Sequence, residues 1–262
     1  MKAIPYPALL LLLAAATPGA AEEIVSLQTR EGVTQSFLLN APDKPPAAVA
    51  VLFPGGHGDI KLRMDGGQIK FAGGNFLVRS RKLFVDGGVA TAVMDAPSDQ
   101  ARGMDDWFRL GDKHATDVVA VVAELKKRFV NTPVFLVGTS RGTISAAATG
   151  RTLGDSISGV VLTSTLFLGA RAGPGLSGFD FATIKAPVLF VHHVNDSCAV
   201  TPYSSAKSQT PRFPLVTVHG GDPPRSDPCE AFSAHGYLGK ERETVEAIVN
   251  WMLKKPYPDN ID

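Results

Sequence analysis

The sequence has almost no net charge. Its 262 residues include 26 lysines and arginines against 25 aspartates and glutamates, which gives a formal net charge of +1 at pH 7. Proteins that bind nucleic acid or an anionic membrane by charge carry a basic excess or a strongly basic face. The overall balance therefore gives no reason to expect nucleic acid or a membrane surface as a partner.

Long hydrophobic runs are also scarce. The longest, from Ala8 to Ala16, has nine residues, whereas a transmembrane helix needs about 20, so no membrane span is expected. Lys2 precedes this run, and Gly19-Ala20-Ala21 follows it, which is the pattern of a secretory signal peptide. We expect cleavage near Ala21 and a secreted or periplasmic protein. The alternative is that the segment stays attached as an interfacial anchor.

Cysteine is almost absent, with Cys198 and Cys229 the only two. An exported chain enters an oxidising compartment, where an even number of cysteines indicates a disulfide bond. We therefore expect a Cys198–Cys229 bridge that closes a loop of about 30 residues. The alternative is two unpaired, buried thiols.

Internal repeats and low-complexity segments are missing too, and residues 22–262 are expected to form a single domain. Segments of strand and helix type alternate along them, which favours an α/β fold with a mostly parallel sheet covered by helices. Two Gly-rich stretches, 57–83 and 164–183, fit neither type and are expected to be loops around a site. The expected strands are 24–28, 35–40, 47–53, 89–94, 134–138, 159–163, 188–193 and 215–218, and the expected helices are 112–129, 141–149 and 241–254.

One short motif indicates a nucleophile. Gly138-Thr139-Ser140-Arg141-Gly142 has the form G-x-S-x-G and stands between a predicted buried strand and a helix rich in small residues. A sharp turn there strains the backbone of Ser140, and glycines on both sides remove side chains that would collide with neighbouring elements. The motif predicts Ser140 as the nucleophile; the alternative is an ordinary serine in a strand–helix turn.

A serine nucleophile needs a base, and the base needs a carboxylate that orients it. In chain order after the serine, Asp196 follows the strand 188–193, and His235 lies between the last strand and the last helix. We predict Asp196 as the acid and His235 as the base. The rivals are weaker: they are the loop residue His219, the neighbours His192 and His193, the early Asp95, and His114, which is expected on a helix surface.

The two cysteines support this assignment. Cys198 comes two residues after Asp196, and Cys229 comes six residues before His235. A bridge between them ties the loop that carries the acid to the loop that carries the base, and so fixes the geometry on which the imidazole tautomer depends.

An acyl-transfer site also needs backbone N–H donors for the developing oxyanion. One is expected from Arg141, directly after the nucleophile. The other is expected from the Gly-rich turn after the strand 47–53, with Gly56 preferred and His57 second. The alternative is that this turn has no such role.

Residues 57–83 carry six basic side chains against Asp59 and Asp65. A net charge of +4 near the site favours an acidic substrate, but such a run is more often a solvated face. The 24 residues between the strands ending at 163 and starting at 188 are too few for a large helical lid.

Taken together, Phe53-Pro54-Gly55-Gly56, the Ser140 motif, Asp196 after its strand and His235-Gly236-Tyr237 resemble the α/β-hydrolase superfamily, especially small dienelactone-hydrolase-like and carboxylesterase-like members. The resemblance implies a mostly parallel eight-stranded sheet flanked by helices without a large lid domain. It further implies hydrolysis of a small-molecule ester with no cofactor. No H-E-x-x-H zinc motif occurs, and no metal is expected. Two alternatives remain, an amidase or peptidase with the same triad and a binding protein with a vestigial triad, and the oligomeric state is not predicted.

Overall fold

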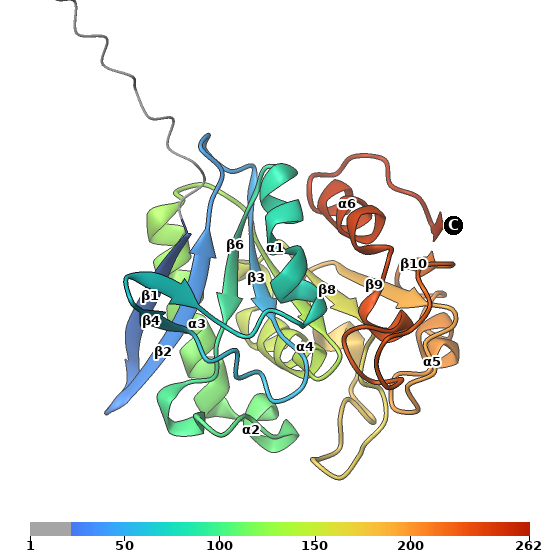
Figure 1. Cartoon of the computed structure of the whole chain (residues 1–262), viewed down its shortest axis with the longest axis horizontal. Coiled ribbons are helices and arrows are strands. Elements are labelled where there is room, and N and C mark those ends of the chain that lie inside the picture. Colours follow the sequence, from blue (N-terminus) through green and yellow to red (C-terminus); the bar gives the residue numbers. More distant parts are fainter. Residues whose placement is uncertain (1–21) are drawn as a thin grey trace, which may run out of the picture.

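A twisted sheet runs through the centre of the molecule in the computed structural model, which describes residues 22–262 (Figure 1). The predicted signal peptide, residues 1–21, lies outside the described residues. The strand order is β1-β2-β6-β3-β7-β8-β9-β10-β11. β1 pairs with β2, and β2 with β6, in antiparallel fashion, and all other pairs are parallel. The strands are β1 Glu22–Arg30, β2 Val33–Asn40, β3 Ala48–Phe53, β6 Val89–Met94, β7 Val134–Thr139, β8 Gly159–Thr163, β9 Val188–His193, β10 Leu215–Val218 and β11 Asn260–Ile261.

The α/β class and the mostly parallel sheet predicted from the sequence are confirmed, but the number of strands differs. The described residues form a nine-stranded sheet, because the last residues of the chain return to the edge of β10. Thr217 pairs with Asn260, and Val218 pairs with Ile261. A strand of two residues is too short to show a periodic pattern, so only eight strands were predicted from the sequence.

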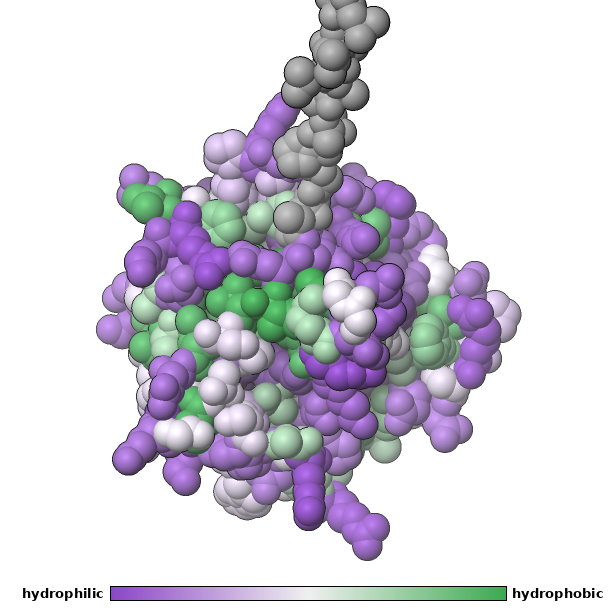
Figure 2. Space-filling model, turned by 60° about the vertical axis from the view of Figure 1, so that its left-hand side comes forward, coloured by the Kyte–Doolittle hydropathy of each residue, from purple (hydrophilic) through white to green (hydrophobic). Residues whose placement is uncertain are grey.

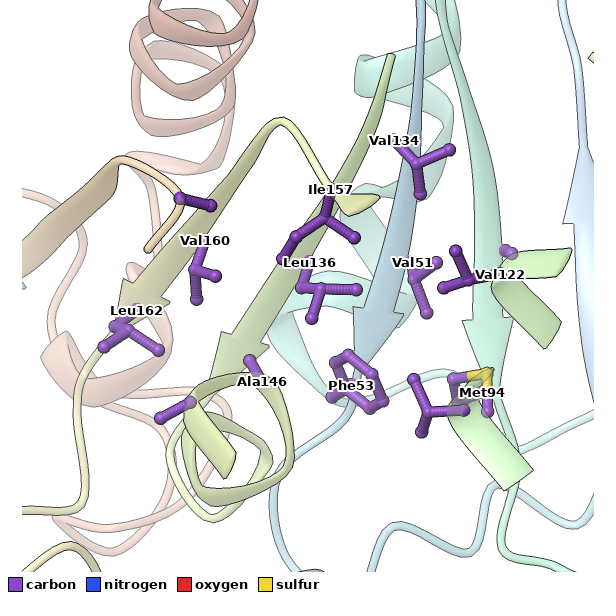
Figure 3. Packing of buried hydrophobic residues seen from close by; sticks show 14 of the residues in the cluster. Val51, Phe53, Met94, Val122, Val134, Leu136, Ala146, Ile157, Val160 and Leu162 are labelled. Carbon is purple, nitrogen blue, oxygen red and sulfur yellow. The ribbon is translucent and has the colours of Figure 1, made fainter. Parts of the chain in front are cut away.

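Helices cover both faces of the sheet. α1 and α6 pack on one face, and α3 and α4 on the other, each over its own hydrophobic cluster. In the cluster under α3 and α4, the side chains of Val51, Leu136 and Val160 come from neighbouring strands, and Val51 lies next to Val122 of α3 (Figure 3). The α-helices are α1 Phe76–Asp86, α2 Asp106–Leu110, α3 Asp112–Arg128, α4 Gly142–Leu153, α5 Tyr203–Lys207 and α6 Glu241–Met252, and the 3₁₀ turns are Ser98–Gln100, Gly154–Ser156, Phe181–Thr183 and Ala234–Gly236.

The first Gly-rich stretch is more ordered than predicted. Residues 57–83 contain a small hairpin, β4 Arg63–Asp65 with β5 Gln68–Lys70, and the start of α1. The Asn75 side chain caps that helix by accepting a hydrogen bond from the Leu77 N–H at 3.1 Å, and caps of this kind define helix starts. The second stretch forms no helix or strand over residues 164–180, as expected.

The surface is mostly hydrophilic, with apolar side chains gathered in the middle of the face turned forward in Figure 2. No helix in the part of the chain that the structure describes has the length and hydrophobicity needed to cross a bilayer.

Candidate active site

Ser140 occupies a strained turn between β7 and α4. Its φ angle is +51°, in the left-handed region that non-glycine residues rarely adopt. The turn is held because the Ser140 N–H donates to the Thr163 carbonyl at 3.0 Å and the Thr143 N–H donates to the Ser140 carbonyl at 2.9 Å. The strain therefore stays in place and presents the serine side chain at the carboxyl ends of the parallel strands.

The glycines on either side of Ser140 are required by close packing. A Cβ atom on Gly142 would lie 2.0 Å from the Phe53 carbonyl oxygen, and one on Gly138 would lie 2.5 Å from the Gly142 carbonyl oxygen. Any side chain at these positions would push α4 away from β3 and β7. The sequence motif thus corresponds to a local steric requirement.

His235 and Asp196 are in direct contact. The His235 Nδ1 lies 2.9 Å from the Asp196 Oδ2, and both side chains are buried. Asp196 also accepts a hydrogen bond from the Thr201 hydroxyl at 2.9 Å and one from the Cys198 N–H at 3.0 Å. The carboxylate is thereby fixed, and it fixes the ring of His235.

The other ring nitrogen of His235 is free for chemistry. Within residues 22–262, the buried Nε2 atom has no hydrogen-bond partner. His235 and Ser140 line the same pocket, which has a volume of about 790 Å³ and also includes Gly56, His57 and Arg141. Five residues from three separate segments, predicted from sequence to share one site, therefore meet around a single cavity, and Asp196 contacts the imidazole of His235.

The rival residues have other roles. The Asp95 carboxylate accepts hydrogen bonds from the N–H groups of Ile60 and Leu62, both at 2.8 Å. The His192 Nε2 accepts the Thr165 N–H at 2.9 Å, and the His193 Nε2 lies 2.9 Å from the Gly220 carbonyl oxygen. Neither these residues nor His219 lines the pocket that contains Ser140.

His114 is not on a helix surface, as the sequence suggested, but fully buried. Its ring packs between Phe53 and Phe108, and neither ring nitrogen has a partner among residues 22–262. Burial, with the nearby Arg109 and Arg30 charges, lowers the pKa of His114 to about 3. The helix is amphipathic, and His114 lies on its apolar side.

A buried network anchors the loop of His235. The Ser164 hydroxyl donates to the His235 carbonyl at 2.8 Å, and the Tyr237 hydroxyl donates to the Val191 carbonyl at 2.7 Å. Arg79 of α1 adds a hydrogen bond to the neighbouring Gly236 carbonyl. Burial raises the pKa of Tyr237, so the phenol stays protonated. The sequence analysis gave no role to Ser164, and it named Tyr237 only as part of the His235-Gly236-Tyr237 motif.

The predicted disulfide is present. Cys198 and Cys229 are bonded, with 4.6 Å between their Cα atoms, and both residues line the pocket. The bridge joins the turn after β9, which carries Asp196, to the loop that leads to His235. It therefore braces the Asp196–His235 pair from the side, as expected from the positions of the cysteines.

The candidate oxyanion donors also lie at the pocket. Gly55–Gly58 forms a tight turn in which the Gly58 N–H donates to the Gly55 carbonyl at 3.1 Å. Across residues 22–262, the N–H groups of Gly56, His57 and Arg141 donate to no protein group. All three residues line the pocket and have N–H groups free for a ligand.

The charges around the pocket balance. The lining includes the basic residues Lys61, Arg102 and Arg141 and, on the acidic side, Asp59, Asp106 and Glu230. Of the six basic residues in the stretch 57–83, only Lys61 is in the lining, whereas Arg79 and Arg81 pair with Glu241 and Glu22. The basic stretch therefore gives the pocket no excess of positive charge.

Next to Ser140 lies an ion pair that the sequence analysis missed. Asp106 of α2 is 1% exposed, and its Oδ1 accepts hydrogen bonds from the Arg141 Nε at 2.9 Å and from a terminal nitrogen of the same guanidinium at 2.6 Å. Its Oδ2 accepts the Gly175 N–H at 2.9 Å. The pair joins α2, the start of α4 and the 164–183 loop. No group of three or more His, Cys, Asp or Glu side chains within the described residues is arranged to hold a metal ion.

Several solved structures are similar to this one. Est1E from Butyrivibrio proteoclasticus has a TM-score of 0.59 and 18% sequence identity, over 88% of this chain and 98% of that chain. A cold-adapted esterase from an Arctic intertidal metagenomic library has a TM-score of 0.60 and 16% identity, over 92% and 96%. An α/β serine hydrolase without a lid from Xanthomonas campestris has a TM-score of 0.55 and 12% identity, over 88% and 95%.

Comparison by sequence gives no relative: no protein-family model and no curated protein matches the chain. At identities below 20%, the similarity of the solved structures establishes the fold and not the reaction. The match spans nearly the full length of each structure. The chain therefore has the α/β-hydrolase fold.

Proposed function

We propose that this protein is a serine hydrolase that cleaves a carboxylic ester through an acyl-Ser140 intermediate. The observation that carries the proposal is the hydrogen bond between His235 Nδ1 and Asp196 Oδ2, together with a free His235 Nε2 in the pocket that holds the strained Ser140. A serine, an imidazole and a carboxylate arranged in this way form the proton-transfer chain of acyl transfer.

The proposed reaction has two steps. In the first, Ser140 Oγ attacks the ester carbonyl while His235 Nε2 takes its proton, and backbone N–H groups bind the oxyanion. Collapse of the tetrahedral adduct releases the alcohol, which receives the proton from His235. In the second step, His235 removes a proton from water, which attacks the acyl-enzyme. His235 then returns this proton to Ser140 Oγ as the second tetrahedral adduct collapses and releases the acid. Asp196 holds the imidazole in the required tautomer throughout.

A panel of p-nitrophenyl esters of graded acyl length tests the proposal, and arylpropenoate esters belong in the panel because Est1E has been solved with ferulic acid bound. We expect turnover by the wild type and loss of at least about 10³-fold in kcat with Ser140→Ala. Activity that survives in Ser140→Ala would show that another group is the nucleophile.

Two further measurements separate the alternatives. Matched p-nitroanilides distinguish an esterase from an amidase, since only an amidase turns them over at rates comparable with the esters. A fluorophosphonate should label the folded wild type at Ser140 and leave Ser140→Ala unlabelled. A wild type that resists the label would instead point to a binding protein with a vestigial triad.

We also propose that the protein is exported. The Cys198–Cys229 bridge supports this, because structural disulfides persist in oxidising compartments and are rare in the cytosol. Expression of the full sequence in a bacterial host, followed by mass spectrometry of the periplasmic fraction, should give a chain that begins at Glu22. A full-length chain confined to the cytosol would contradict the proposal.

A further inference from the structure

Residues 22–262 contain a buried cation that forms no ion pair. Arg109 of α2 is 1% exposed and is the bulkiest of the fully buried side chains. The carboxylate nearest in sequence, Asp106, is paired with Arg141 instead. Among residues 22–262, the Arg109 guanidinium donates to two neutral groups only, the Ser145 hydroxyl at 2.8 Å and the Gly56 carbonyl at 3.3 Å, and its Nε has no partner.

Such an arrangement is expensive for the fold. A buried charge costs several kcal/mol unless a countercharge or a full set of hydrogen bonds compensates it. Burial and repulsion by Arg141 lower the pKa of Arg109 to about 9, so the side chain is still a cation at neutral pH. An unpaired cation in this position indicates a role other than stability.

The Gly56 carbonyl belongs to the central peptide of the Gly55–Gly58 turn. The turn is closed by the hydrogen bond from Gly58 N–H to Gly55 carbonyl, so the peptide between Gly56 and His57 takes no part in closing it. No peptide bond in the described residues is cis, and in a trans peptide the C=O and N–H bonds point in opposite directions. Since the Gly56 C=O points inward to Arg109, the His57 N–H points outward, on the side of the pocket.

Tight packing holds the turn in this orientation. A Cβ on Gly58 would lie 2.5 Å from a terminal nitrogen of Arg109, and the His57 carbonyl accepts the Met104 N–H at 2.9 Å. Through Ser145, the same guanidinium is bound to α4, the helix that begins beside Arg141. Arg109 therefore connects the turn of one candidate oxyanion donor to the helix of the other.

We propose that Arg109 is a positioning residue for the oxyanion hole: it holds and polarises the Gly56–His57 peptide, so that the His57 N–H is the second donor beside Arg141. The inference rests on the proposed hydrolase function and changes the sequence-based preference for Gly56. A hydrogen bond to a peptide carbonyl strengthens the N–H of the same peptide as a donor, because hydrogen bonds in a chain polarise one another. The cation also favours negative charge developing nearby.

The test compares Arg109→Met, Arg109→Lys and Ser145→Ala with the wild type. Removing one oxyanion donor from a serine hydrolase lowers kcat by about 10²–10³-fold, and weakening one should lower it by roughly 10–100-fold. We expect that loss for Arg109→Met with a KM within about 3-fold of the wild-type value, partial recovery in Arg109→Lys, and a loss for Ser145→Ala that is smaller than that of Arg109→Met. Ser145→Ala removes one hydrogen-bond partner of Arg109 and keeps the contact with the Gly56 carbonyl.

A pair of inhibitors separates positioning from loss of structure. A trifluoromethyl ketone forms a tetrahedral oxyanion adduct with the serine, whereas the matching methyl ketone binds without one. For Arg109→Met, we expect the inhibition constant of the trifluoromethyl ketone to rise by the same factor as kcat falls, with the methyl ketone unaffected. Equal weakening of both ketones, or a kcat of Arg109→Met within about 3-fold of the wild-type value, would overturn the inference.

Two outcomes need separate treatment. If Arg109→Met does not fold, the comparison of Arg109→Lys with Arg109→Gln takes its place, because both keep a donor and only one keeps the charge; an equal kcat in the two overturns the role of the charge. If the wild type neither turns over esters nor reacts with a fluorophosphonate, the proposed function itself fails. Active wild type with normal Arg109 variants refutes the inference alone.

Discussion

Replacing both cysteines by alanine should weaken the fold and the site together. The bridge joins residues 31 positions apart. On the chain-entropy relation, a loop of this length is worth about 3–4 kcal/mol of folding free energy. At roughly 2–4 °C per kcal/mol for a domain of this size, the midpoint of thermal unfolding should fall by about 7–15 °C.

The activity should fall as well, for a geometric reason. The Cys198 N–H donates a hydrogen bond to the Asp196 carboxylate, and Cys229 begins the segment that leads to His235. Without the bridge, the two segments are held only by hydrogen bonds, and a misplacement of about 1 Å can cost about 10²-fold in rate. We expect kcat on a p-nitrophenyl ester to fall by roughly 10-fold at 15 °C, well below the new midpoint.

Circular dichroism melts and ester kinetics on the Cys198→Ala/Cys229→Ala double variant provide the measurement. Wild type treated with dithiothreitol is the matched control and should reproduce both effects. A midpoint within about 2 °C of the wild-type value would refute the stability argument. A lowered midpoint with unchanged kcat would show that the bridge holds the fold but not the Asp196–His235 geometry.

The remaining predictions concern single positions. Asp196→Asn should lower kcat by about 10⁴-fold with little change in the unfolding midpoint, since the imidazole loses its orienting carboxylate; a loss below about 10-fold would remove Asp196 from the triad. Gly142→Ala should prevent folding or yield insoluble protein, because its Cβ would lie 2.0 Å from the Phe53 oxygen, whereas Gly73→Ala, with no atom nearer than 3.8 Å, should behave as wild type in a solubility assay. For His114, burial depresses the pKa to about 3, so the unfolded chain binds a proton below pH 6.5 that the folded chain does not, and His114 alone lowers the stability by about 1.4 kcal/mol for each pH unit as the pH falls from 6.5 toward 3. His114→Phe should reduce the slope measured by urea titrations at pH 6.5 and 4.5 by this amount and leave the similar contribution of the buried His192; equal slopes in the two proteins would contradict the assignment.

Much of the fold follows from short-range patterns in the sequence. Buried parallel strands such as β3, β7 and β9 are continuous apolar runs, which explains why their bounds were predicted closely. The serine turn was predictable because Gly138 and Gly142 are demanded by contacts that any such turn must make. The disulfide followed from the number of cysteines and their positions beside the candidate acid and base.

What the sequence did not reveal depends on contacts between distant segments. The short helix α2 was missed because five residues are too few to show a helical period, yet it supplies both Asp106 and Arg109 to the site. The roles of Ser164 and Tyr237 were missed since their partners are backbone carbonyls of other loops and strands. Long-range hydrogen bonds of this kind leave no pattern along the chain.

The short strand at the end of the chain bears on how the molecules behave toward one another. Exposed strand edges invite pairing with another chain, and natural proteins blunt them with very short strands. β11 covers β10 with two residues only, and the Ile261 carbonyl accepts the His219 N–H at 2.7 Å. Trimming residues 259–262 would uncover the edge of β10 at Thr217 and Val218, both of which are buried, and would thereby create a template for aggregation. Affinity tags are accordingly better added through a flexible spacer after Asp262 than in place of the last residues.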